Sequence, residues 1–107
     1  MQFVLEFAPA DVSGTYRRQA ALAIPTTDYD PATGDVIDPA DLRMSKLFSL
    51  APLSIVTSGA TWTGMFIPLT LFGGGPDVIY WYNNQTGLEA ALHENLFTLL
   101  FLEAIGQ

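Results

Sequence analysis

The chain has 107 residues, of which 50% are hydrophobic and only 14% are charged, and its net charge at pH 7 is −7. It contains no cysteine, which excludes a disulfide framework and any cysteine-based metal site. The few basic residues lie in the first half of the chain, so a basic stripe for nucleic acid or for an anionic membrane surface is disfavoured. These basic residues are Arg17, Arg18, Arg43 and Lys46.

The length fits one domain, spanning 1–107, with a modest core for its surface. The charged share is well below the roughly 25% that is typical of globular domains. We therefore expect part of the surface to lie against a partner, as in an obligate homo-oligomer, rather than against water. The alternative is a monomer covered by neutral polar residues. No basic signal-peptide start precedes the apolar residues at 3–7, and the runs at 47–56 and 96–102 are too short to cross a bilayer. We thus expect synthesis in the cytoplasm and no membrane association.

Turn signals divide the first half of the chain into short segments. Residues 4–7 predict a first strand, and 16–27 a second, although the alanine-rich centre of the latter would also suit a helix. Residues 26–37 predict a hairpin, in which Asp30 caps the turn, Pro31 fixes its backbone and Gly34 accepts a positive φ. A second turn or a single helical turn is expected at 38–41, and apolar segments follow at 44–50 and 53–57.

The strongest strand signal lies in the centre of the chain, where two strands at 61–72 and 77–82 are joined across three glycines and Pro76. The run at 78–82 is β-branched and aromatic throughout, which suits a pleated and largely buried surface. Alternation predicts that Val78, Tyr80 and Tyr82 share one face and that Ile79 and Trp81 share the other.

The segment 88–105 supports two interpretations. Leucine, alanine and glutamate give it high helix propensity, but a helix over 96–102 would be apolar nearly all round and would need a larger core. We therefore predict a turn or short helix at 87–94 and a strand at 96–104. Together with the regular turn signals, this predicts an all-β fold, a small antiparallel sandwich or barrel of jelly-roll-like or immunoglobulin-like type.

Patterns that could carry chemistry are weak. The acidic residues of the loop region do not match a calcium-binding loop, because Ala32 and Thr33 stand where an oxygen ligand and glycine are required. His93 is the only histidine and has no catalytic motif around it, and the glycines at 73–75 lack the lysine of a phosphate loop. We predict no catalytic, cofactor-binding or metal-binding residues, and no enzymatic activity. The acidic residues concerned are Asp28, Asp30, Asp35, Asp38 and Asp41.

Aromatic residues of the central hairpin are candidates for core packing, for a protein interface or for stacking on a sugar. The paired arginines Arg17 and Arg18 could anchor an acidic neighbouring subunit. The aromatic candidates are Trp62, Phe66, Tyr80, Trp81 and Tyr82.

Three stretches resemble small structural proteins of tailed bacteriophage virions. The resemblance covers about two thirds of the chain and departs at 88–101, which is richer in leucine than expected. The stretches are Asp-Tyr-Asp-Pro-Ala-Thr-Gly-Asp at 28–35, the run from Thr-Trp-Thr-Gly at 61–64 through Leu-Phe-Gly at 71–73 to Val-Ile-Tyr-Trp-Tyr-Asn at 78–83, and Thr-Gly-Leu-Glu at 86–89 followed by 97–106.

The resemblance implies a capsid decoration, or cement, protein. Such a protein is a β module bound to the outside of the head, and it carries no catalytic residues. The implied partners are the major capsid protein or other virion subunits, together with further copies of the chain as a trimer or dimer, and the implied location is the virion. The alternatives are a tail, fibre or head–tail component, or a carbohydrate-binding module that uses the aromatic residues.

Overall fold

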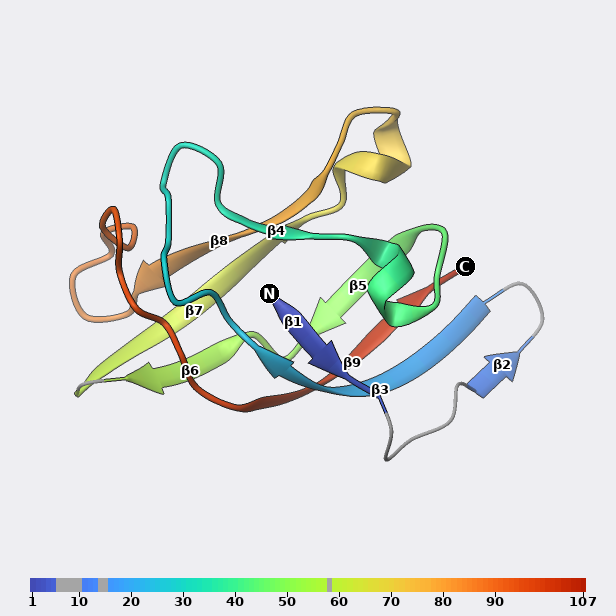
Figure 1. The fold of residues 1–107 in the computed structure, drawn as a ribbon, viewed down its shortest axis with the longest axis horizontal. Helices are drawn as coiled ribbons and strands as arrows, with labels where there is room; N and C mark the ends of the chain where they lie inside the picture. The colour runs from blue at the N-terminus through green and yellow to red at the C-terminus, as the bar shows by residue number, and fades with distance from the viewer. Residues whose placement is uncertain (6–10, 14–15, 58) are drawn as a thin grey trace.

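The computed structural model describes residues 1–5, 11–13, 16–57 and 59–107, and these residues form an all-β structure. Strands make up 51% of the chain, and no helix in the described part reaches seven residues. The strands form two antiparallel sheets (Figure 1). The predicted fold class, a small antiparallel β protein, is confirmed.

The first sheet runs in the order β1-β3-β9-β5. The short strand β2 pairs with the start of β3, whereas β1 pairs with its end. Its long central strands β3 and β9 pair over seven positions, from Arg17 opposite Gly106 to Ala23 opposite Leu100. The chain thus brings its last strand beside its first long strand. The strands are β1 (Gln2–Val4), β2 (Asp11–Ser13), β3 (Tyr16–Ile24), β5 (Leu47–Ala51) and β9 (Leu100–Gly106).

The second sheet runs in the order β4-β8-β7-β6. Its centre is the antiparallel pair β7–β8, in which Met65 lies opposite Tyr80 and Gly64 lies opposite Trp81. This pair is the hairpin that the sequence predicts. The strands are β4 (Asp35–Ile37), β6 (Ser54–Thr57), β7 (Ala60–Ile67) and β8 (Asp77–Asn83).

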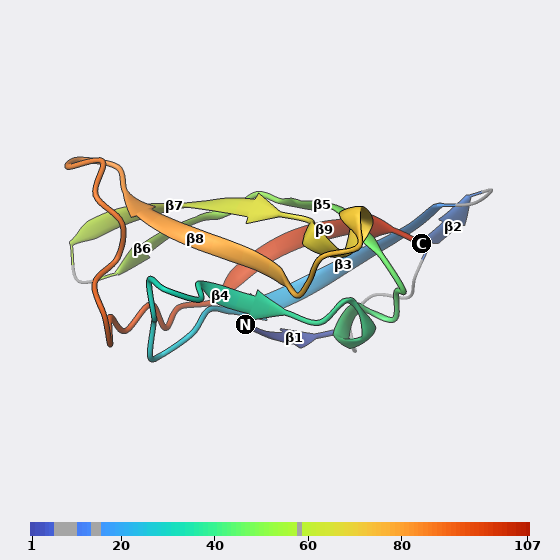
Figure 2. The same ribbon diagram turned by 90° about the horizontal axis from the view of Figure 1, so that it is seen from above.

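One hydrophobic core is shared by the inner faces of both sheets. Ala21, Leu102 and Ala104 contribute from the first sheet, and Ile79 and Trp81 from the second. The molecule measures 41 × 31 × 20 Å, and its 20 Å depth is what two sheets packed about 10 Å apart occupy with their side chains. The outer faces of the two layers are therefore not covered by a third layer of the described chain (Figure 2).

The turn predicted at 30–34 forms, but the hairpin predicted around it does not. The backbone N–H groups of Thr33 and Gly34 donate to the carbonyl oxygen of Asp30, and the Asp30 carboxylate accepts from the N–H of Ala32. The returning strand β4 pairs with β8 in the other sheet. The reason is that β3 already has β9 on one edge and β1 on the other, so no edge of β3 is free for a returning strand.

Two 3₁₀ turns follow strands of the second sheet, one after β4 and one after β7. The first, η1 (Pro39–Leu42), begins at Asp38, whose carboxylate accepts from the N–H of Ala40, and it matches the helical turn predicted at 38–41. The second, η2 (Leu69–Phe72), replaces the end of the strand predicted over 61–72, because Pro68 ends β7 at Ile67.

The C-terminal segment contains a strand, as predicted, but the strand is shifted to Leu100–Gly106. Of the turn or short helix predicted at 87–94, a turn forms at 92–93 and no helix forms. The backbone of this segment bonds to its neighbours instead. The N–H of Ala90 donates to the carbonyl of Trp81, and the N–H of His93 donates to that of Tyr29. Two isolated β-bridges add to these contacts, one between Glu89 and Tyr82 and one between Glu94 and Tyr29. Tertiary pairing therefore overrides the helix propensity of the leucines.

Candidate functional site

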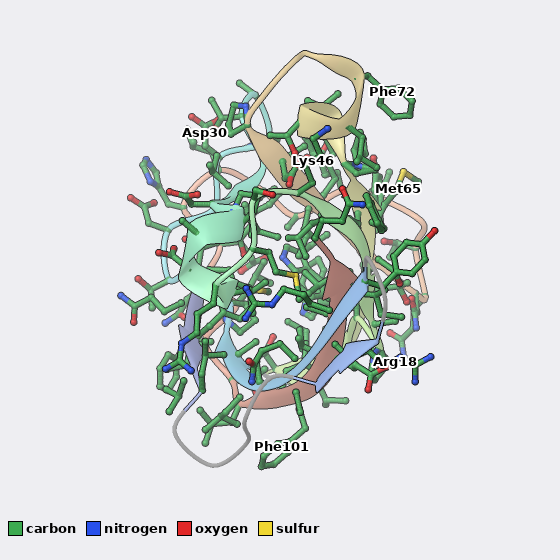
Figure 3. The ribbon with its side chains drawn as sticks, turned by 90° about the vertical axis from the view of Figure 1, so that its right-hand side faces the viewer. Arg18, Asp30, Lys46, Met65, Phe72 and Phe101 are labelled. Atoms are coloured by element: carbon green, nitrogen blue, oxygen red, sulfur yellow. The ribbon has the colours of Figure 1, made fainter. Side chains whose placement is uncertain are left out.

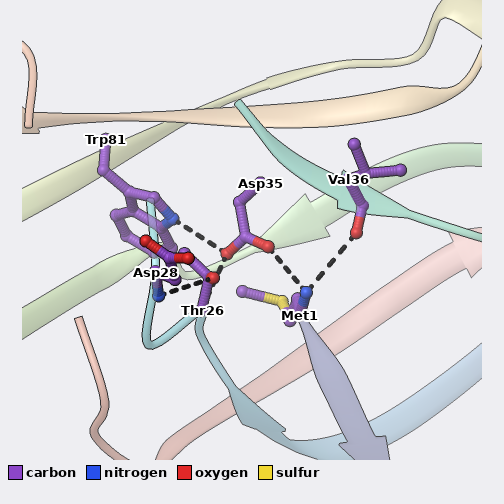
Figure 4. Close-up of polar contacts among 6 residues, drawn as sticks. All are labelled: Met1, Thr26, Asp28, Asp35, Val36 and Trp81. Atoms are coloured by element: carbon purple, nitrogen blue, oxygen red, sulfur yellow. Dashed lines mark hydrogen bonds and ion pairs between the residues drawn. The ribbon is translucent and has the colours of Figure 1, made fainter. Parts of the chain in front are cut away.

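Asp35 is the centre of a buried polar cluster between the sheets (Figure 4). Its Oδ1 atom lies 2.6 Å from the α-amino nitrogen of Met1. The Asp35 side chain is almost completely excluded from solvent, whereas Met1 is only partly buried. Its Oδ2 atom accepts from the backbone N–H of Thr26 at 3.2 Å and from Nε1 of Trp81 at 3.3 Å. Both carboxylate oxygens are thus occupied by structural contacts. The cluster ties β1, the end of β3, β4 and β8 together.

Tyr29 fills a second buried polar position, beside the edge of β8. Its hydroxyl donates to Oε2 of Glu89 at 2.7 Å and accepts from the backbone N–H of Trp81 at 3.2 Å. Burial raises the pKa of Tyr29, and the hydrogen bond to Glu89, which requires the phenol proton, raises it further. The phenol therefore stays neutral and acts as a structural hydrogen-bonding group.

The remaining acidic residues do not converge on a ligand site. Asp77 is fully buried, and its Oδ1 atom accepts from the backbone and hydroxyl groups of Thr70, while its Oδ2 atom has no hydrogen-bond partner in the described part of the chain. Asp28 lies on the surface, 2.5 Å from Nδ1 of His93. Within the described ranges, no three acidic, histidine or cysteine side chains are grouped so that they could hold a metal ion.

The structure places two of the candidate interface residues, Trp62 and Trp81, inside the protein, and a third, Phe66, partly buried. Trp81 is completely buried, Trp62 is 7% exposed with its Nε1 atom donating to Oγ1 of Thr57, and Phe66 packs against the core. Of the three roles that the sequence leaves open, Trp62 and Trp81 therefore take the core role, and Phe66 remains a candidate interface residue. A sugar-stacking platform also needs exposed rings, so Trp62 and Trp81 cannot provide one.

Tyr80 and Tyr82, in contrast, lie half-buried on the outer face of the second sheet, as their alternation with Ile79 and Trp81 predicts. Strand register places them on one face with Met65, which is 54% exposed, and with Val36 and Val56. We call this outer face the neutral face, because none of its strand residues carries a carboxylate, an amine or a guanidinium group. Its members are Val36, Ser54, Val56, Thr61, Thr63, Met65, Ile67, Val78, Tyr80 and Tyr82.

The outer face of the first sheet is a second candidate surface. Phe101, near the start of β9, is 68% exposed and points away from the body of the molecule (Figure 3). Leu22 lies opposite it on β3, and Val4 of β1 lies opposite Leu22. We call this surface the Phe101 face. Its members are Val4, Arg18, Ala20, Leu22, Phe101, Glu103 and Ile105.

The paired arginines are separated by the alternation of β3. Arg18 is exposed on the Phe101 face, whereas Nη1 of Arg17 donates to the carbonyl of Arg43 at 2.8 Å. The sequence-based prediction missed Phe101 because it lies in a continuously apolar run. The alternation of residues at the end of this run could have identified it. In a strand, Phe101 shares a face with the charged Glu103, whereas Leu100 and Leu102 share the opposite face.

The fold and these two surfaces define an all-β two-sheet module whose outer faces carry accessible apolar side chains. No family model, curated protein or solved structure matches the chain. A search of the described residues finds no helix long and apolar enough to cross a membrane.

Proposed function

We propose that the chain is a non-enzymatic virion structural protein that acts by assembly, as a capsid decoration protein on the head of a tailed double-stranded DNA phage. The observation that carries the proposal is the Phe101 face. There, a large aromatic side chain that is 68% exposed lies beside Leu22, near the start of the central strand β9. The major capsid protein is the expected partner.

The chemistry of the Phe101 face suits seating on another protein. Burying the ring of a phenylalanine removes apolar surface from water and contributes about 1.5–3 kcal/mol. Arg18 and Glu103 border the apolar centre and can pair with polar groups at the rim. A standard interface takes about 800 Å² from each partner. This is about one seventh of the 5871 Å² surface of the chain.

The charge of the chain also supports a position on the outside of a shell. At a net charge of −7, the protein is repelled by packaged DNA and is tolerated on the outer surface. Stabilisation would come from the area buried where the module spans neighbouring capsid subunits, and no chemical step is needed.

The test is co-sedimentation of the purified chain with heads of the phage that encodes it, using Phe101→Glu and Phe72→Glu as a matched pair. Phe72 is 79% exposed but lies on η2, at the opposite end of the molecule from Phe101 (Figure 3). We expect Phe101→Glu to lose binding and Phe72→Glu to retain it. Heads that bind the wild-type chain should also withstand a higher temperature before releasing DNA.

Two results would contradict this function. Heads that never bind the chain would remove the decoration role, and binding to purified tails instead would favour the alternative of a tail or fibre component. Equal binding by the wild type and by Phe101→Glu would show that the Phe101 face is not the seating surface.

A further inference from the structure

The neutral face reverses the usual distribution of polarity in a sheet with one solvated side. Antiparallel sheets ordinarily bury apolar side chains and expose charged ones. Here the two aspartates of β4 and β8, Asp35 and Asp77, lie on the inner side and are buried. The outer side of the same two strands carries Val36, Val78 and Tyr80.

The face is also continuous across all four strands. Register pairs Val36 with Val78, Ile67 with Val78, Met65 with Tyr80 and Val56 with Thr61, so the apolar side chains form adjacent rows. The nearest carboxylate along the edge of the sheet belongs to Glu89, which is bridged to Tyr82 and bonds to the Tyr29 hydroxyl. Val36, Val56 and Met65 are exposed on this face, Tyr80 and Tyr82 are half-buried, and Val78 is buried. A sheet face with exposed apolar side chains and no charged strand residue is a candidate interaction surface.

Charge indicates which partner fits. Two copies of a chain with net charge −7 repel each other wherever carboxylates meet. None of the exposed acidic side chains of the described chain lies on a strand of this face. Asp38 and Asp41 lie at η1 and Glu103 lies on the other sheet, while the turn region that holds Asp28 borders the face where Gly34 packs on Val78. The neutral face therefore lets two copies approach without bringing like charges together.

The shape of the surface is compatible with the same partner. A pleated sheet face without a deep pocket packs on another such face at about −30°. A two-fold axis through the face would place each residue opposite the equivalent surface of the other copy. The four strands hold 22 residues, 3 in β4, 4 in β6, 8 in β7 and 7 in β8, and at about 3.3 Å per residue and about 4.8 Å between strands they offer roughly 350 Å² per copy, an area typical of weak, transient contacts. This area fits a reversible dimer.

We propose that the neutral face is the surface through which two copies of this chain associate, face to face, around an axis near Met65 and Tyr80. The inference rests on the proposed assembly function and deepens it, because it assigns self-association to the second sheet and leaves the Phe101 face for the virion partner.

Sedimentation velocity from 1 to 500 µM tests the proposal with a matched pair of charge substitutions. Met65→Glu places a like charge at the centre of the neutral face in each copy, and Phe101→Glu makes the same charge change on the other sheet. We expect the wild type and Phe101→Glu to dimerise alike, and Met65→Glu to dimerise at least tenfold more weakly. Val56→Glu, at a 65% exposed edge position of the same face, repeats the test if Met65→Glu does not fold.

A label supplies a geometric readout. Because the chain has no cysteine, Met65→Cys and Phe101→Cys each introduce a single thiol for a spin label. In the dimer, the distance between labels should be short at position 65 and long at position 101. The reverse pattern would show that the other sheet is the contact surface and would overturn the proposal.

Three further outcomes would also overturn the proposal. The first is a wild type that remains monomeric up to 500 µM, and the second is equal weakening of the dimer by Met65→Glu and Phe101→Glu. The third is that the wild type forms no dimer but Met65→Glu loses binding to phage heads. The last would make a virion subunit the occupant of the neutral face. If the chain dimerises through the neutral face but does not bind phage heads, the decoration function is contradicted and this inference still holds.

Discussion

The carboxylate of Asp35 shows how one residue joins four elements of the fold. It contacts the Met1 amino group, the Thr26 backbone and the Trp81 indole. A buried charge is tolerated only when it is paired and hydrogen-bonded, and removing one partner leaves the other uncompensated. The contact is therefore sensitive to substitution although it accounts for little net stability by itself.

We predict that Asp35→Asn lowers the free energy of unfolding by about 1–3 kcal/mol, because the amide removes the counter-charge of the partly buried Met1 ammonium and has one acceptor oxygen where the buried carboxylate has two. Urea denaturation followed by tryptophan fluorescence measures the loss. The control is Asp41→Asn, which makes the same chemical change on an exposed side chain and should change stability by less than about 0.5 kcal/mol. Equal stability of the two variants would contradict the role of the cluster.

Tyr29 predicts how stability depends on alkaline pH. Its pKa is raised in the folded state, whereas in the unfolded chain it is about 10. Above pH 10 the unfolded chain releases this proton and the folded protein keeps it, so stability falls as the pH rises, by up to about 1.4 kcal/mol per pH unit for this group. Below pH 10 the group contributes no slope.

We expect Tyr29→Phe to be less stable than the wild type at pH 7 by about 1–3 kcal/mol, because Glu89 and the Trp81 N–H lose their partner. We also expect its stability to fall less steeply between pH 10 and 11. Tyr16→Phe, at an exposed tyrosine, controls for the loss of a surface hydroxyl. Parallel stability curves for Tyr29→Phe and the wild type would contradict this account.

At the scale of elements, the turn at 30–34 is the joint by which the chain passes from one sheet to the other. Gly34 has a φ of +73°, and a Cβ atom there would lie 2.3 Å from Cγ2 of Val78. The turn thus packs directly on β8, and only a residue without a side chain fits between them.

The matched pair Gly34→Ala and Gly87→Ala separates backbone strain from packing. Gly87 has a similar φ of +71° with nothing within 4 Å of its Cβ position. We predict that Gly87→Ala costs about 1–2 kcal/mol from the left-handed backbone alone, and that Gly34→Ala costs a further 1–3 kcal/mol from overpacking. Thermal or urea unfolding measures both. Equal losses would show that the contact with Val78 does not constrain the turn.

At the scale of the whole molecule, the proposed assembly depends on the balance between a net charge of −7 and the apolar side chains exposed on the two outer faces. Repulsion between copies acts over a Debye length, about 30 Å at 0.01 M salt and about 8 Å at 0.15 M. The neutral face provides contact energy that does not depend on charge.

If two copies meet through this face, raising the salt from 0.01 to 0.3 M should strengthen the dimer several-fold, because salt screens the repulsion and removes no attractive ion pair. Sedimentation velocity across this salt series measures the change. An interface built on ion pairs would weaken over the same range, and that result would contradict a neutral contact surface.

The sequence by itself determined the all-β class, the β7–β8 hairpin, the turn at 30–34 and the faces of β8, because these features depend on local turn chemistry and on two-residue alternation. Alternation also placed Tyr80 and Tyr82 together, but it could not say which face of β8 meets the core. Only the tertiary structure decided that β4 crosses to the other sheet, that residues 87–94 lie along β8 without forming a helix, and that Trp81 is buried while Phe101 is exposed. The physical reason is that strand pairing and burial join residues far apart in the chain, such as Ala23 with Leu100, whose mutual position no local pattern encodes.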